Sequence, residues 1–370
     1  MQLALSSSQL ALQDSVRRFC RDHYSGVPRP RRADEHWNKF AELGWLGSAL
    51  PVDVGGSAAT PIETAILLEE FGRALVVEPF WSCVVLAGRL IDLGADRPHR
   101  AALLPPLVAG GLLIAAAHSE DAHSGMDEVT TLAVETADAY TITGTKTLII
   151  DGPNADKFII PARTSDGNIG LFLMDQEHLS SFISDYGLID GRRACDLAFR
   201  NVQISRDALI GPPAQGRGAL DAAIDEAMVG LCAEAVGILD SVLWMTRDHL
   251  KLRQQYGGPL STQQALQHRM ADMFVEVEMS RSAMLRALRS LMAGDPTARR
   301  QAALAAYIHV CRSGSFVCGN GIQLHGAVGM TEESIIGQYF KRFFVISKMF
   351  GDVSLQLNRF SVLSSVNDVG

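Results

Sequence analysis

Closely spaced cysteines are missing from this chain, since its six cysteines contain no CxxC pair and no tight ligand spacing. They are Cys20, Cys83, Cys195, Cys232, Cys311 and Cys318. This scatter argues against a zinc site and a disulfide framework, and indicates buried thiols in a reducing compartment. The first eight residues lack the basic start of a secretory signal. No uninterrupted apolar run reaches the roughly 18 to 20 residues of a membrane span. We therefore expect a cytoplasmic protein that does not enter a membrane.

The chain also lacks an excess of positive charge, because its formal net charge is -8. Proteins that bind nucleic acid rely on a basic surface, so that class is disfavoured and the acidity is interpreted as solubility. With 47% hydrophobic and 20% charged residues, the composition is that of a soluble globular enzyme. A chain of 370 residues is long enough for two or three packed units.

The hydrophobic pattern predicts a mostly helical α+β protein with three parts. Residues 1–110 read as an N-terminal helical domain, in which Thr60-Pro-Ile-Glu63 is typical of a capping box. Residues 111–212 read as a middle β domain, a small antiparallel barrel or sandwich. The expected strands are 112–117, 130–135, 139–145, 158–162, 170–174 and 196–204.

Residues 213–370 predict a C-terminal four-helix bundle. Its four amphipathic stretches are expected near 218–255, 262–293, 297–325 and 332–366. His268 and His325 do not indicate a metal, because di-iron bundles use Glu-x-x-His pairs and these helices contain none. The glycines around Arg217 do not follow a strand in a βαβ unit, so a Rossmann site is disfavoured.

Two glycine turns separate these helices and carry the strongest functional signal. The first is Arg253-Gln-Gln-Tyr-Gly-Gly-Pro-Leu, followed by Gln264. The second is Gln323-Leu-His-Gly-Ala-Val-Gly-Met-Thr-Glu-Glu. Arginine, glutamine and glycine can together hold a nucleotide diphosphate. The alternative for Arg253 is a solvated arginine that neutralises the helix C-terminus.

These turns resemble the flavin-binding signature of the acyl-CoA dehydrogenase family, and the order of helical, β and bundle parts matches that family over nearly the whole chain. Within the family, the chain is most similar to the paired subunits of bacterial sterol and dicarboxylate breakdown, such as the small subunit of pimeloyl-CoA dehydrogenase. The stretches that carry this resemblance are Asp225-Glu-Ala, Cys232-Ala-Glu-Ala-Val-Gly, Gln267-His-Arg-Met-Ala-Asp-Met, Tyr339-Phe-Lys-Arg and Phe350-Gly-Asp.

The resemblance implies an FAD site shared between two chains. Arg253 takes the place of the arginine that contacts the FAD diphosphate of the neighbouring subunit, and Tyr256 lies in the turn that follows. Gln264 helps to hold the cofactor, and Gln323 corresponds to the glutamine that binds the adenosine part. Gly326 matches the first of two glycines lying against the dinucleotide, while the second is replaced by Ala327.

The sequence departs from the family pattern beside the flavin ring. The usual Trp-x-Ser or Trp-x-Thr is replaced by Leu148-Ile149-Ile150, which has neither the aromatic face nor the hydroxyl. The preceding loop reads Ser119-Glu-Asp-Ala-His-Ser-Gly-Met where Thr-Glu-Pro-Gly-Ala-Gly-Ser-Asp is usual. The middle domain is therefore poorly equipped to hold an isoalloxazine ring.

Family chemistry, as the resemblance implies it, removes an α-proton with a carboxylate while a hydride passes from the β-carbon to the flavin. Most members hold this base in Glu-Gly-Thr, where this chain has Phe350-Gly351-Asp352. A minority hold it on the first bundle helix at the position of Ala227. Glu226 is adjacent, about 100 degrees around the helix, and is our candidate base. Asp225 matches an aspartate near the CoA nucleotide, and Glu234 is expected to pair with an arginine.

Three hypotheses remain. The first is an FAD-dependent acyl-CoA dehydrogenase subunit that passes electrons to an electron-transfer flavoprotein and works in a dimer or a dimer of dimers. The second is a non-catalytic partner that completes the FAD site of a homologous catalytic chain. The third is a purely structural helical scaffold. The small residues beside the cleft are compatible with dicarboxyl, sterol or branched acyl groups.

Overall fold

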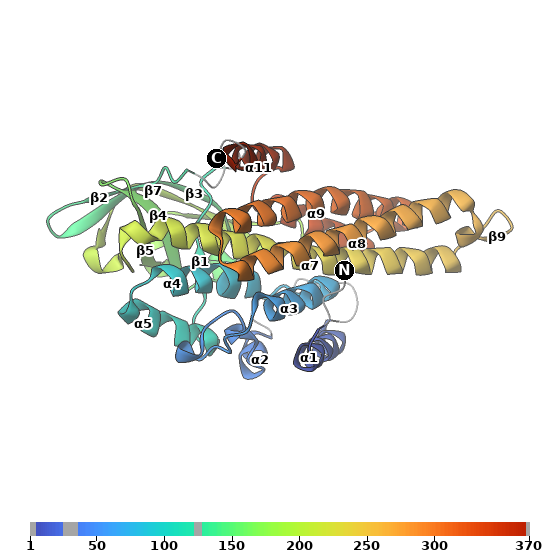
Figure 1. Ribbon diagram of the computed structural model, residues 1–370, viewed down its shortest axis with the longest axis horizontal. Coiled ribbons are helices and arrows are strands. Elements are labelled where there is room, and N and C mark those ends of the chain that lie inside the picture. The colour runs from blue at the N-terminus through green and yellow to red at the C-terminus, as the bar shows by residue number, and fades with distance from the viewer. Residues whose placement is uncertain (1–4, 25–35, 122–127, 368–370) are drawn as a thin grey trace.

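The computed structural model describes residues 5–24, 36–121 and 128–367. Helices form the two ends of the chain and a curled sheet lies between them in sequence (Figure 1). Helices α7, α8 and α9 run side by side and extend past the rest of the molecule as an arm. The mostly helical α+β fold predicted from the sequence is confirmed.

The N-terminal helices pack against the bundle below the arm (Figure 1). Ser6 caps the first helix in a reciprocal capping box with Gln9. At Thr60 the hydroxyl accepts a hydrogen bond from the Ile62 N–H and donates one to Glu63, so this cap differs from the reciprocal box expected there. The elements are α1 (Ser7–His23), α2 (Trp37–Glu42), η1 (Trp45–Gly47), η2 (Val52–Val54), α3 (Pro61–Ala74), the π-helix η3 (Phe80–Gly88), α4 (Arg89–Gly94) and α5 (Arg97–Val108).

The β region forms one sheet in the order β1-β4-β2-β3-β7-β6, with β5 paired to β4. The pairings of β4 with β1 and with β2 are parallel, so the expected antiparallel arrangement holds for the other strand pairs but not for these two. Strand β6 was not predicted. The strands are β1 (Ile114–Ala116), β2 (Leu132–Glu135), β3 (Ala139–Ile150), β4 (Lys157–Thr164), β5 (Ile169–Asp175), β6 (Ile183–Gly187) and β7 (Arg193–Ser205), with η4 (Gly152–Asn154), α6 (Gln176–Leu179) and η5 (Arg206–Ala208) between or after them.

The C-terminal region is a helical bundle whose fourth predicted helix is broken. The segment 347–352 separates α10 from α11 and includes Gly351 at φ +86, a value that favours glycine. The elements are α7 (Pro213–Leu252), β8 (Gln254–Gln255), β9 (Gly258–Pro259), η6 (Leu260–Thr262), α8 (Gln264–Ala293), α9 (Pro296–His325), η7 (Gly326–Met330), α10 (Ile335–Ile346) and α11 (Val353–Asn367).

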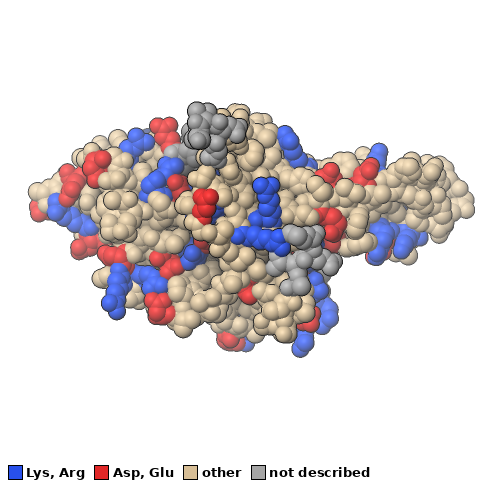
Figure 2. Space-filling view, in the orientation of Figure 1, with Lys and Arg blue, Asp and Glu red and all other residues tan. Residues whose placement is uncertain are grey.

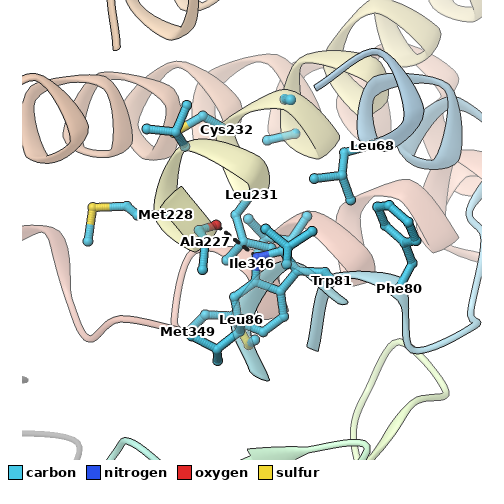
Figure 3. Close-up of a cluster of buried hydrophobic side chains, with 14 of the residues drawn as sticks. Leu68, Phe80, Trp81, Leu86, Ala227, Met228, Leu231, Cys232, Ile346 and Met349 are labelled. Atoms are coloured by element: carbon cyan, nitrogen blue, oxygen red, sulfur yellow. Dashed lines mark hydrogen bonds between the residues drawn. The ribbon is translucent and has the colours of Figure 1, made fainter. Parts of the chain in front are cut away.

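One hydrophobic core joins the N-terminal helices to the bundle, and a second core fills the inside of the sheet. Figure 3 shows the first core where η3 meets α7, with Trp81 Nε1 donating a hydrogen bond to the Ala227 carbonyl at 2.8 Å. Helix α7 is long and apolar enough to cross a membrane by composition alone. However, 78% of its most apolar window is buried inside the protein, as in the central helix of a soluble fold.

Candidate functional site

The first predicted turn lies at the tip of the arm, where α7 ends (Figure 1). Arg253 is the C-cap of α7, and its carbonyl accepts a hydrogen bond from Leu260 N–H at 2.9 Å, which closes the β8–β9 hairpin. Tyr256 sits in this hairpin with 88% of its surface exposed. Gln264 is the first residue of α8 and is also exposed.

The second turn ends α9 at the same end of the bundle. His249 of α7 stacks on His325 of α9, with ring centroids 4.2 Å apart and planes 26° apart. This contact brings the end of α7 beside the end of α9, so the two predicted turns converge. Gln323 is exposed, and Gly326 has φ +65, which favours glycine.

Free hydrogen-bonding groups gather at this tip. Within the described ranges, the guanidinium of Arg253 forms no ion pair with a carboxylate. The amide side chains of Gln264 and Gln323 likewise form no hydrogen bond with any described residue. Charged hydrogen bonds from arginine suit phosphate oxygens, and the amides suit sugar or base edges. The tip therefore carries the kinds of group that suit an anionic dinucleotide.

Glu226 lies near the middle of the molecule, far from this tip along α7. It forms a bidentate ion pair with Arg89 of α4, through Nε at 2.7 Å and Nη2 at 3.0 Å. Both residues line a cavity of about 350 Å³ between the N-terminal helices, α7 and α8. Arg89 lies 137 positions before Glu226 in the chain and was not predicted as a site residue.

Asp225 points to a different cavity, of about 520 Å³, between α7, α9 and α11. Its carboxylate binds the Arg299 guanidinium at 2.9 Å and also pairs with Arg300. Burial raises the pKa of Asp225, and the two guanidinium groups counteract that rise. Because Arg217 and Arg359 also line the cavity, it is suited to an anionic ligand, with Asp225 holding two of the arginines in place.

Phe350 occupies the centre of a buried aromatic cluster. Its ring lies 6.0 Å from Trp81, 5.8 Å from His118 and 5.6 Å from Tyr307, measured between ring centroids. The neighbouring Asp352 is exposed and pairs with Lys348. This position of the cluster therefore holds the phenylalanine ring of Phe350 and no carboxylate.

His118 was not predicted as a site residue. Its ring is buried, and its Nε2 atom has no hydrogen-bond partner among the described residues. Burial lowers the pKa of His118 to about 4, and the charge of Lys146 acts in the same direction. An orphaned buried nitrogen beside Phe350 is therefore neutral near pH 7.

The segment 148–150 belongs to β3. Leu148 has φ +51 and its N–H donates to Asp196 at 2.9 Å, while Ile149 and Ile150 are buried. Two residues earlier in the same strand, buried Lys146 pairs with Glu120 at 2.5 Å. Burial acts to raise the pKa of Glu120, but Lys146 and hydrogen bonds from nearby threonines lower it to about 2. The altered loop continues into residues 122–126, which lie outside the described ranges.

Two protein-family models match the chain. "Acyl-CoA dehydrogenase, N-terminal domain" covers residues 6–111, and "Acyl-CoA dehydrogenase, C-terminal domain" covers residues 214–360. This chain belongs to the acyl-CoA dehydrogenase family. The resemblance inferred from the two turns is thereby confirmed, and so is membership in a family of oxidoreductases that act on CH-CH groups.

Individual acyl-CoA dehydrogenase relatives are similar over most of their length. Isobutyryl-CoA dehydrogenase of Dictyostelium discoideum is 28% identical, with 92% of this chain and 82% of that protein covered. The caffeyl-CoA reductase-Etf complex subunit CarC of Acetobacterium woodii is 27% identical, with 82% of each covered. The solved Tcur3481–Tcur3483 steroid ACAD superposes with a TM-score of 0.87 at 27% identity, covering 98% of this chain and 99% of that chain.

Acyl-CoA dehydrogenases depend on FAD, and the two halves of this chain fit that cofactor unequally. The tip of the arm offers a glycine turn together with an arginine and two amides that have no partner among the described residues, and these groups fit the diphosphate and adenosine. In the middle region, Leu148, Ile149 and Ile150 offer no side-chain hydroxyl to the ring. The prediction that Glu234 of α7 pairs with an arginine is confirmed, because buried Glu234 pairs with Arg342 at 2.7 Å.

Proposed function

We propose that this chain is one subunit of an FAD-dependent acyl-CoA dehydrogenase that desaturates an acyl-CoA thioester between its α and β carbons. The observation that carries the proposal is the convergence of the two glycine turns at the tip, through the His249–His325 stack. When bound, FAD accepts the hydride from the β-carbon. The tip residues bind and orient it.

Each tip residue has a proposed role. Arg253 donates paired hydrogen bonds to the diphosphate, while Gln264 and Gln323 hold the adenosine side. Tyr256 covers the turn, and Gly326 lets backbone approach the dinucleotide because it carries no Cβ. Ala327 follows it and is exposed, so its methyl group does not block the turn from within the protein.

The proposed partner is a homologous acyl-CoA dehydrogenase subunit. Support comes from exposed apolar side chains along the arm, which we call the arm surface, and Figure 2 shows few charges at its far end. The arm surface consists of Trp244, Leu252, Tyr256, Phe274, Val275, Met279, Phe316, Val328 and Met330. Exposed apolar side chains on one projecting part of a protein favour a protein interface there. The name of the steroid ACAD joins two proteins, in keeping with a two-chain assembly.

An electron-transfer flavoprotein is the proposed electron acceptor, and the cytoplasm is the proposed location. The CarC relative is named as part of a complex with Etf, which supports the first point. The acyl-CoA nucleotide is proposed to use the arginine-lined cavity around Asp225. Four guanidinium groups near one cavity favour phosphate groups over neutral ligands.

Glu226 is the proposed base. It faces a cavity, but both of its oxygens are held by Arg89. Contact between the carboxylate and a substrate α-proton requires this pair to loosen, because Arg89 occupies both oxygens.

A second candidate function is the non-catalytic partner. It is supported by the packing of Phe350 in an aromatic cluster at the position where most family members carry the base. It is also supported by Arg89, which donates hydrogen bonds to both oxygens of Glu226. In this version the chain supplies Arg253 and Gln323 to a flavin whose ring lies in the sister chain.

Flavin content separates the two candidates. The chain is purified alone and together with its coexpressed homologous partner, and bound flavin is measured by absorbance. One FAD per chain in the solo protein dismisses the partner-only function. No flavin alone, with flavin in the assembled pair, supports it; no flavin in either preparation contradicts both.

Arg253→Ala tests the tip. We expect at least a tenfold loss of FAD affinity in the assembled protein, because a charged hydrogen bond contributes about 1.5–3 kcal/mol. Lys251→Ala is the matched control, since it removes the same charge from an exposed residue two positions away. Equal flavin retention in both variants would reject the assignment of Arg253.

Glu226→Gln tests the base. If Glu226 removes the α-proton, reduction of the bound flavin by acyl-CoA should slow by about 10² to 10⁴, while FAD content stays unchanged. Unchanged reduction in stopped-flow measurements would assign proton removal elsewhere, including to the sister chain.

A further inference from the structure

Most of the side chains that line the cavity beside Glu226 are apolar. The cavity volume of about 350 Å³ lies within the range of small-molecule sites. Branched and sulfur-containing side chains form one wall, namely Val85, Val229, Leu288, Leu291 and Met292, and small residues form much of the rest. Such a shape accepts a compact branched or cyclic hydrocarbon more readily than an extended polar chain.

Of the described residues that line the cavity, Arg89 and Glu226 are the charged ones. Arg89 donates through Nε and Nη2 to Glu226 and through Nη1 to Asp92. Three of its five N–H groups are therefore engaged, and two remain for a ligand oxygen. A hydroxyl can also donate to Glu226.

The charges around this pair do not favour an added anion. Asp92 also accepts from Arg100 at 2.8 Å, and Arg100 pairs with Asp53 at 2.6 Å. Arg97 also acts electrostatically on Asp53, so three arginines face three carboxylates and the group carries no net positive charge. A ligand carboxylate placed here would approach Glu226 without a free counter-charge.

The cavity lies close to the aromatic cluster of Phe350. A Cβ on Gly230 of α7 would lie 3.6 Å from Trp81 Cδ1 and 3.5 Å from Val85. The same Trp81 ring packs against Phe350. The Trp81 ring therefore lies near Gly230, which lines the cavity, and also packs against Phe350, where most family members hold their base.

We propose that this cavity holds the acyl group of the substrate, and that the group is an uncharged branched or cyclic hydrocarbon with at most a neutral oxygen facing Arg89 and Glu226. This inference rests on the proposed function. It excludes the dicarboxyl option and retains the sterol-like and branched ones.

Two probes with one carbon skeleton test the charge preference. Isothermal titration of the full chain at pH 7.5 compares 4-cyclohexylbutan-1-ol with 4-cyclohexylbutanoate. We expect the alcohol to bind at least about tenfold more tightly, because like charges a few ångströms apart repel even at an effective protein dielectric. Equal affinities, tighter binding of the carboxylate, or no binding of either probe at millimolar concentration would overturn the proposal.

Two variants locate the binding. Met292 lies at the rim of the cavity and is 46% exposed, so Met292→Trp should fill the cavity and reduce the affinity for the alcohol at least tenfold. Leu10→Trp is the control, because Leu10 is 49% exposed on α1, and it should leave that affinity unchanged. Glu226→Gln removes one negative charge and should therefore reduce the difference in affinity between the alcohol and the carboxylate. Alcohol binding unaffected by Met292→Trp, or an affinity difference unaffected by Glu226→Gln, would contradict the site.

Flavin loading is measured on the same preparations. If the assembled protein holds FAD normally and the probes fail, the inference about the acyl group falls while the proposed subunit function stands. If FAD is absent but the alcohol binds as expected, the proposed function falls and the cavity remains a site for neutral hydrocarbons.

Discussion

At the scale of single residues, burial decides which charges this fold can tolerate. His118 is buried against Phe350, and Lys146 nearby adds positive charge. A protonated imidazole would be both desolvated and repelled there. The fold therefore keeps this ring neutral, and protonation in acid works against the folded state.

His118 should make stability depend on pH. Its pKa is about 4 in the folded protein, against a reference of 6.5, so the unfolded chain binds more protons between these values. The stabilisation is complete above pH 6.5 and is lost as pH falls toward 4, by up to about 3 kcal/mol. Denaturant unfolding of the wild type and of His118→Leu at several pH values measures this difference.

The variant should lose less stability than the wild type as pH falls from 7 to 4. His178→Leu serves as control, because that side chain is 76% exposed. Parallel pH profiles for wild type and His118→Leu would show that the buried ring does not set this dependence.

Residue-scale predictions from sequence succeeded where local pattern was enough. Because Glu234 lies on an apolar helix face, it was expected to pair with a cation, and it pairs with Arg342. The identity of that arginine, 108 positions away, was not readable from spacing. For the same reason, Arg89 could not be predicted as the partner of Glu226. His118 could not be predicted either, because its Nε2 atom lacks a partner among the described residues only as a result of tertiary packing.

At the scale of elements, the contact between α3 and α7 depends on two glycines. A Cβ on Gly237 would lie 1.9 Å from the Glu69 carbonyl oxygen, and one on Gly72 would lie 2.0 Å from the Glu234 carbonyl oxygen. The two helix backbones thus approach too closely for any side chain. This contact fixes α7, which carries Glu226, against the N-terminal helices.

Gly237→Ala should lower the free energy of unfolding by about 1–3 kcal/mol or more, because the added methyl group meets backbone that must move. Gly218→Ala is the control on the same helix, where a Cβ would meet no atom within 4 Å. That change should be neutral or stabilising by up to about 1 kcal/mol, since alanine favours helix. Equal effects of the two substitutions in urea unfolding would refute the close-contact argument.

Most elements were predictable because their hydrophobic periods are clear, and the exceptions have physical causes. Strand β6 was missed because Ile183-Ser-Asp-Tyr-Gly187 has little apolar content and is stabilised by pairing with β7. The break between α10 and α11 was missed because the helical pattern continues across it, with Gly351 as the only local breaker. The parallel pairs of β4 depend on tertiary order, which strand propensity does not encode.

At the scale of the whole molecule, the arm joins two properties. Its tip carries the free polar groups proposed to bind FAD, and its sides carry the exposed apolar arm surface. If a second subunit covers those sides, cofactor binding and assembly are coupled, because a ligand held by both chains stabilises the assembly over the separated chains.

Leu252→Glu tests this coupling. Leu252 is 81% exposed beside Arg253, and burial of a leucine contributes roughly 1.5–3 kcal/mol. A charge there should weaken association of the subunits at least tenfold, as measured by light scattering during gel filtration, and FAD content should fall with it. Val52→Glu is the control, since Val52 is 68% exposed on η2, away from the arm. An assembly that stays intact in Leu252→Glu would place the partner on another face, whereas one that dissociates yet keeps its flavin would separate cofactor binding from the shared interface.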